Sequence, residues 1–477
     1  LQASWWISEL PPEPVRSLVQ DDLMWYGRLI GLAVGFLLLL VNYHVSEEGE
    51  RSEFISLILF STAGILLVAN ANDLMLLFLA LELVSIPTYI LIGLSRKSLL
   101  AQEATGKYFF LGAFAAALNL YGFSFLYGAT GTAQLFGSAS GRDCIYLILS
   151  RPGGLNDPLV MVGLLLSLAG LTFKIAAVPF YFYVADVYQG AASPVAGLLG
   201  FVPKFAGFIA IIRLLSLCGW AYGGAVFWLL WVLAAATMFV GNTLALMQDN
   251  VKRMLAYSSI AHSGYMLVAL VAGPGPQGGM SASPMQNGLS AALFYMVVYG
   301  VMNLGAFAVL AYFRKTESDG EDSVETLRDI AGTARRHPWA CLALAICVLG
   351  LMGFPLTAGF LGKVYVFSAG LSSGAGPAAQ YAMVVLVVLG VINAAIGAAY
   401  YLRILSACYL GRSTESITPS RCVALRLGIA LCAIAVLALF FKPGPLIDRS
   451  RAAVAAVPVI SPTMTAPTLP PGPMRRH

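Results

Sequence analysis

The chain has 477 residues, of which 59% are hydrophobic and only 11% are charged. A soluble domain carries roughly 25% charged residues, so this composition excludes a soluble protein and indicates a multi-pass membrane protein. The seven cysteines show no CxxC spacing and the chain has only four histidines. We therefore expect no metal site and no haem, iron–sulfur or other redox cofactor in this chain.

Residues 1–22 are fairly polar and lack the basic start and apolar run of a signal peptide. Apolar runs of about 20 residues then predict about twelve transmembrane helices within residues 23–442, with no soluble domain. Residues 443–477, rich in proline, alanine and threonine, are predicted to form a disordered tail. The twelve spans are 23–43, 54–71, 74–94, 107–127, 159–183, 191–216, 224–247, 252–272, 288–313, 338–369, 379–410 and 423–441.

Basic residues gather in alternate loops. The loops of the other side hold little beyond Arg142 and Arg151. The positive-inside rule places the basic side in the cytoplasm, and both chain termini, including the polar segment 1–22, on the opposite face. The basic side contains Arg51, Arg96, Lys97, Lys107, Lys252, Arg253, Arg314, Lys315, Arg328, Arg335, Arg336, Arg412 and Arg421.

Two of the twelve spans are interrupted by proline and carry a lysine. In the fifth span Pro179 follows Lys174 by five residues, and in the tenth Pro355 precedes Lys363. A proline kink alone explains either span. The same combination in two halves of a chain instead points to an inverted-repeat transporter whose ion path crosses the broken helices.

Glu82 and Lys204 are also ionisable residues inside apolar spans. An ionised side chain near the bilayer centre costs at least ~2.5–3.5 kcal/mol, so such residues usually have partners and functions. If Glu82 pairs with Lys174, it stays ionised and keeps the lysine charged, which makes it a candidate modulator. Lys204 lies too deep to reach the interface, unlike Arg213 near its span end, and is either a proton carrier or a permanently paired structural residue.

His262 lies in the eighth span among small hydroxyl residues, in LAYSSIAHSGYM. Histidine titrates near neutral pH, so His262 is a further candidate for a proton relay, and a structural histidine is the alternative. Weaker candidates of the same kind are Glu103, Lys107, Asp186, Tyr257 and Arg403.

Several long segments resemble a known family. They are LLFLALELVSIPTYILIGL, EATGKYFFLGAFAAALNLYGFSFLYGATGT, TFKIAAVPFYFYVADVYQGA, QDNVKRMLAYSSIAHSGYM and GFPLTAGFLGKVYVF. In amino-acid sequence and in order along the chain they resemble the NuoN family, the N-type antiporter-like membrane subunits of respiratory complex I. The resemblance covers most of residues 54–410.

The resemblance implies an all-α fold of fourteen transmembrane helices with two inverted five-helix repeats, here roughly 54–216 and 224–410. It also implies a proton relay of Glu82, Lys174, Lys204 and Lys363. Only twelve spans are visible, so counterparts of the family's two leading helices are expected to be missing, through a truncated record or a true variant.

The implied function is proton translocation in the membrane arm of an NADH:quinone oxidoreductase in a bacterial inner membrane. NADH, FMN, iron–sulfur clusters and quinone are then expected in partner subunits, and none of them in this chain. The implied partners are the L-, M-, K- and J-type membrane subunits and the lipid bilayer, with no nucleic acid.

Two alternatives stay open at this point: a stand-alone Mrp-like cation/proton antiporter subunit, and a scaffold subunit that pumps nothing. The related M-type subunits usually carry glutamate where this chain has Lys363. The L-type subunits carry a long lateral helix that nothing after Pro443 could supply.

Overall fold

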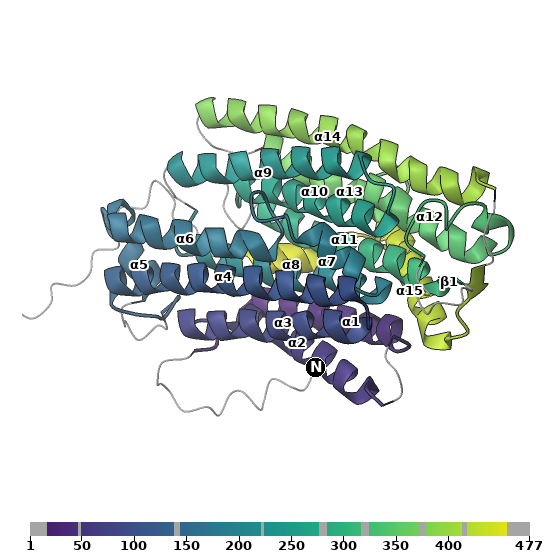
Figure 1. Cartoon of the computed structure of the whole chain (residues 1–477). Coiled ribbons are helices and arrows are strands. Elements are labelled where there is room, and N and C mark those ends of the chain that lie inside the picture. Colours follow the sequence, from purple (N-terminus) through teal and green to yellow (C-terminus); the bar gives the residue numbers. More distant parts are fainter. Residues whose placement is uncertain are drawn as a thin grey trace, which may run out of the picture.

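The computed structural model describes residues 17–45, 49–137, 144–220, 224–275, 284–315, 324–372, 377–412 and 417–455. These form an all-α bundle, as predicted (Figure 1). Besides short 3₁₀ turns, the described part contains one two-stranded antiparallel ribbon, β1 (Phe313–Lys315) with β2 (Ile417–Pro419). The helices are α1 (Asp22–Asn42), α2 (Arg51–Asn70), α3 (Leu74–Ser95), α4 (Leu99–Thr130), α5 (Ile145–Leu149), α6 (Pro158–Lys174), α7 (Val184–Gly190), α8 (Ser193–Ser216), α9 (Gly224–Leu246), α10 (Val251–Ala272), α11 (Gly288–Tyr312), α12 (Pro338–Met352), α13 (Ala358–Leu371), α14 (Pro377–Leu410), α15 (Val423–Phe441) and α16 (Gly444–Ala455).

Ten of the described helices are long and apolar enough to cross a membrane, and α6, α12 and α13 are shorter apolar helices. The span with Lys174 and Pro179 and the span with Pro355 and Lys363 are broken, whereas α8 continues through Pro203. The fifth divides into α6 and α7, and the tenth into α12 and α13. Proline cannot donate a backbone hydrogen bond and disfavours the helical conformation of the preceding residue, so both helices end before it.

Three helices form the centre of the bundle. The apolar stretches of α8 and α11 are completely buried and that of α10 is 94% buried, whereas only 33% of the corresponding stretches of α4, α9, α14 and α15 is buried. A helix that is apolar on all sides belongs in a core or against lipid. Figure 1 shows α8, α10 and α11 inside the bundle and α14 along one edge.

Ion pairs join the loops at each end of the bundle. Glu325 accepts hydrogen bonds from Arg96 at 2.8 Å and from Lys252 at 3.0 Å. This gathers the α3–α4 loop, the start of α10 and the segment before α12, all of which belong to the basic set of loops. At the opposite end, Asp21 before α1 forms a bidentate pair with the buried Arg213 of α8.

The segment predicted to be a disordered tail begins with a helix. In α16, Ile447, Ser450, Ala453 and Val454 are buried, and the helix packs against α1 and α11. Ser450 Oγ lies 2.9 Å from Ser290 Oγ of α11. These buried residues are three or four positions apart and so share one face of the helix. The prediction of disorder rested on the overall composition of the segment, which does not show this periodicity. Residues 456–477 of the predicted tail, and 1–16 of the polar N-terminal segment, lie outside the described residues.

Candidate functional site

Glu82 of α3 and Lys174 of α6 form a buried ion pair. The Lys174 Nζ donates to Glu82 Oε1 at 3.0 Å and also to Ser85 Oγ. The Lys174 side chain is 2% exposed and that of Glu82 is 19% exposed. Ser85 lies three residues after Glu82, so one face of α3 presents both acceptors to the lysine. Lys174 is the last residue of α6, where the negative end of the helix dipole favours a cation.

Lys204 lies at the centre of the bundle, on the fully buried α8 and directly after Pro203. Its Nζ donates to the Ser259 carbonyl and, at 2.9 Å, to Ser263 Oγ, both on α10. The same ammonium lies 5.6 Å from the ring centroid of Tyr299 on α11. Carbonyl, hydroxyl and aromatic ring satisfy the charge in part, and no described carboxylate lies within ion-pairing distance of it.

Two features connect Lys174 with Lys204. Ser263, which accepts from Lys204, donates at 2.6 Å to the carbonyl of Ile175, the residue that follows Lys174. A cavity of about 10 Å³ is also lined by both lysines together with Tyr108, Tyr183 and Tyr188. A cavity of this size has room for about one water molecule, and its lining is polar enough to hold one. The two lysines are therefore connected by the hydrogen bond of Ser263 to the end of α6 and by one small cavity that both of them line.

His262 lies next to Ser263 on α10, on the side towards the C-terminal half. Its Nδ1 is 2.7 Å from the Tyr295 hydroxyl of α11, and its Nε2 is 3.0 Å from the Tyr401 hydroxyl of α14. Tyr401 in turn hydrogen-bonds the Ser258 hydroxyl. Each hydroxyl can donate or accept, so either neutral tautomer of the imidazole is satisfied here.

Lys363 of α13 lies at the break in the tenth span. Its Nζ donates to the carbonyls of Leu351 at 3.0 Å and Met352 at 2.8 Å, which are freed at the end of α12. The ammonium also lies 5.1 Å from the ring centroid of Tyr265. A Cβ atom at Gly353 would lie 2.9 Å from the Lys363 side chain, so the residue at this turn, which has φ of +85°, is best a glycine.

The weaker candidates lie at the periphery. Asp186 of α7 accepts from Lys107 at 2.9 Å and from Arg253 at 2.7 Å. Glu103 also pairs with Lys107. Arg403 donates to the Leu246 carbonyl and to Asp249, whose side chain is 86% exposed. Tyr257 is half-buried on α10. These groups lie at the end of the bundle that carries the basic loops. They do not bond Lys174, Lys204 or Lys363, which we call the lysine series.

Arg213 lies near the end of its span, as expected from the sequence, but it is covered by protein and does not face lipid. It is 3% exposed and also donates to the Ala69 carbonyl at 2.7 Å. The hydroxyl groups that bond the lysines, those of Ser85 and Ser263, and the Tyr401 hydroxyl that bonds His262 were also not singled out as functional residues. The signal for Ser85 is its spacing of three from Glu82, whereas nothing local marks Tyr401. Among the residues that the structure describes, no group of three or more histidine, cysteine or acidic side chains could hold a metal ion.

The broken helices and the buried ion pair followed by lone lysines define a helical membrane protein of the antiporter-like class. The family described as "NADH:quinone oxidoreductase/Mrp antiporter, TM" matches residues 71–396. Subunit N of the NADH-quinone oxidoreductase of Trichlorobacter lovleyi is 40% identical over 84% of this chain and 76% of its own length. A subunit N of Roseiflexus castenholzii is 41% identical over 86% and 78%.

Solved structures agree. A chain of respiratory complex I from Thermus thermophilus is 31% identical with a TM-score of 0.73, covering 94% of this chain and 91% of that one. A chain of the Mrp complex from Dietzia has a TM-score of 0.76 at 20% identity, which shows a shared fold. The chain belongs to the N subunits of the NADH-quinone oxidoreductases.

Proposed function

We propose that this chain translocates protons in the membrane arm of an NADH:quinone oxidoreductase. Glu82, Lys174, Lys204 and Lys363 form the relay, and His262 joins the last two. Protons enter from the basic, cytoplasmic side and leave on the opposite face of a bacterial inner membrane. The segments 54–216 and 224–410 act as two inverted repeats, each with one broken helix.

The observation that carries this proposal is the bonding of Lys204. It is buried without a described carboxylate and reaches the end of α6 through Ser263. On its other side the ring of Tyr299 lies 5.6 Å from the Lys204 Nζ and 5.0 Å from the ring of His262. A lysine that merely joins two helices needs a permanent counter-charge, because an unpaired buried charge is costly. A lysine that alternates between a charged and a neutral form needs only polar groups that can hydrogen-bond to the amine in both forms.

Energy has to come from partner subunits. Moving one charge against 100 mV requires about 2.3 kcal/mol, and this chain is expected to carry no redox group that releases it. NADH, FMN, iron–sulfur clusters and quinone would act in those partners, and L-, M-, K- and J-type subunits would surround this chain. A change of charge that separates Glu82 from Lys174 would let the amine give up its proton and start the sequence.

The test uses the assembled complex in proteoliposomes, with Lys204→Ala and the matched control Lys442→Ala. Lys442 is an exposed lysine after α15, outside the relay. We expect Lys204→Ala to lose NADH-driven proton translocation, or to stall quinone reduction, while the complex still assembles and Lys442→Ala behaves as wild type. Unchanged proton stoichiometry in assembled Lys204→Ala complex would make the chain a scaffold.

The second candidate is an independent cation/proton antiporter, favoured by the fold shared with the Mrp complex. Such an exchanger needs a site of several oxygen ligands for the dehydrated cation. Among the described residues, Glu82 is the carboxylate that pairs with a lysine of the proposed relay. Purified chain in liposomes should therefore fail to exchange sodium for protons, and exchange without partners would favour this candidate.

A further inference from the structure

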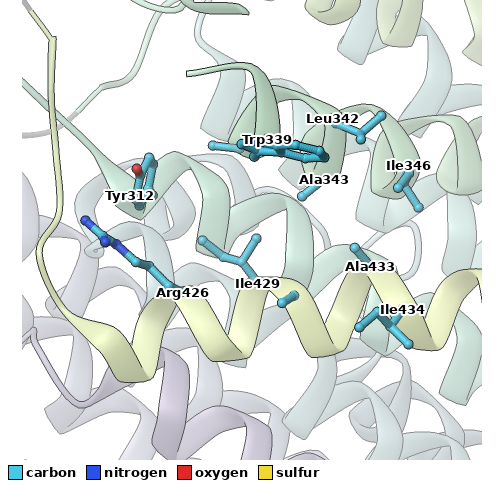
Figure 2. A pocket seen from close by; sticks show the side chains of 11 residues that line it. Tyr312, Trp339, Leu342, Ala343, Ile346, Arg426, Ile429, Ala433 and Ile434 are labelled. Carbon is cyan, nitrogen blue, oxygen red and sulfur yellow. The ribbon is translucent and has the colours of Figure 1, made fainter. Parts of the chain in front are cut away.

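A surface groove between α12 and α15 lies away from the lysine series. Its volume is about 530 Å³, within the range of small-molecule sites. Figure 2 shows Trp339, Leu342 and Ile346 along one wall and Ile429 and Ile434 along the other. The wall on α15 extends over about 12 Å, which is less than half of the ~30 Å hydrocarbon core.

Small side chains make the groove hollow. Ala340 and Ala343 of α12 and Ala430 and Ala433 of α15 are among its lining residues. Both α12 and α15 are apolar helices, and Leu342 is 45% and Ile434 62% exposed. In a membrane such a surface faces hydrocarbon, so an extended acyl chain fits the groove by shape and polarity.

One end of the groove is polar and basic. Arg426 donates through Nε and Nη2 to the Ser420 carbonyl, at 3.1 and 2.9 Å, and lies 5.8 Å from the ring centroid of Tyr312. Two of its five N–H groups are thus used, and the guanidinium is held in place with donors to spare. Figure 2 shows Tyr312 and Arg426 together at this end.

The same end carries the marks of a membrane interface. Trp339, in the first turn of α12, is 82% exposed, and tryptophan concentrates at the head-group level of bilayers. The lining residues include no acidic side chain. Four further arginines lie within five residues of Tyr312, Trp339 or Arg426 in the sequence, which assigns this end to the basic side; they are Arg314, Arg335, Arg336 and Arg421.

We propose that this groove binds one anionic phospholipid, with an acyl chain between α12 and α15 and its phosphate at Arg426 and Tyr312. Basic pockets between transmembrane helices on the cytoplasmic side are suited to anionic head groups, and the basic loops put this end on that side. The guanidinium supplies two parallel N–H donors of the spacing that phosphate oxygens accept. The proposal does not depend on proton translocation by the chain.

The experiment is photo-cross-linking in the assembled complex with phospholipids that carry a diazirine in the acyl chain. Phosphatidylglycerol and phosphatidylcholine analogues with the same acyl chain are compared, and cross-linked peptides are mapped by mass spectrometry. We expect the peptides of the start of α12 and of α15 to be labelled about five-fold more by phosphatidylglycerol, the effect of one basic residue at a membrane surface.

Three variants and a control separate the contributions. Arg426→Gln should remove the head-group preference, Arg426→Lys should keep most of it, and Ala430→Leu should lower labelling by both lipids because the exposed Ala430 projects into the groove. Arg421→Gln is the matched control, an exposed arginine outside the lining, and should behave as wild type.

Equal labelling by both head groups in wild type would overturn the proposal, and so would loss of preference in Arg421→Gln as large as in Arg426→Gln, since the cause would be diffuse surface charge. Labelling of the isolated chain but not of the assembled complex would assign the groove to a helix of a neighbouring subunit and also overturn it.

Discussion

The two broken spans hold their lysines in different ways. Lys174 of the N-terminal half has a carboxylate partner, Glu82, and a hydroxyl. Lys363 of the C-terminal half has two backbone carbonyls and an aromatic ring. A carboxylate can move or change its charge, whereas carbonyls at a helix end are fixed dipoles. In the proposed relay, the first site would receive the signal and the second would deliver the proton.

The largest effect is expected from Lys363→Arg. The guanidinium keeps the positive charge that the freed carbonyls of α12 bind, but its pKa above ~12 prevents proton release. We expect coupled quinone reduction to fall by about a hundred-fold, the scale of one group in proton transfer. NADH-driven quinone reduction and acidification in proteoliposomes measure this, with Lys442→Arg as control. A fully active Lys363→Arg complex would show that this site need not release a proton.

Glu82→Gln tests the site of the first broken span, where Glu82 pairs with Lys174. Glutamine preserves volume and a hydrogen-bond acceptor but removes the negative charge that pairs with Lys174. We expect turnover to fall by about ten-fold, the scale of one hydrogen bond to a charged group, and Glu82→Asp to retain more activity. Both variants are compared in the same assay after assembly has been checked on native gels. Equal activity of the two would remove the modulator role.

Tyr401→Phe should have a smaller effect. It removes the hydroxyl shared by His262 Nε2 and Ser258, a neutral hydrogen bond worth about 1 kcal/mol, so a decrease of about five-fold is expected. Tyr26→Phe is the matched control, because the hydroxyl of the buried Tyr26 donates to the Leu293 carbonyl at 2.8 Å, away from His262. Similar rates in both variants would separate His262 from the relay.

Asp21→Asn should leave the proton stoichiometry unchanged. Asp21 and Arg213 form a partly buried ion pair like that of Glu82 and Lys174, but lie outside the lysine series. Breaking a buried pair costs about 3–5 kcal/mol, so the yield and melting temperature of the complex should fall. Altered stoichiometry in the complex that does assemble would place this pair on a proton path.

The sequence predicted the ionisable residues better than their partners. Glu82, Lys174, Lys204 and Lys363 stand out because each is costly in an apolar span, and proline marks the two breaks. The partners of Lys363 are backbone carbonyls, which no side-chain pattern reveals. Tyr401 reaches His262 from α14, 139 residues away, and only tertiary packing brings them together. The helix α16 was not predicted because the overall composition of residues 443–477 indicated disorder, although its buried residues recur at helical spacing.

The most direct measurement is the number of protons translocated per quinone reduced by complexes that carry Lys204→Arg. Arginine preserves the charge at the junction of the two halves but cannot release its proton. We predict that assembled Lys204→Arg complex translocates fewer protons per quinone than wild type, or stops reducing quinone. Wild-type stoichiometry at a wild-type rate would contradict proton exchange at Lys204 and leave this residue a structural charge.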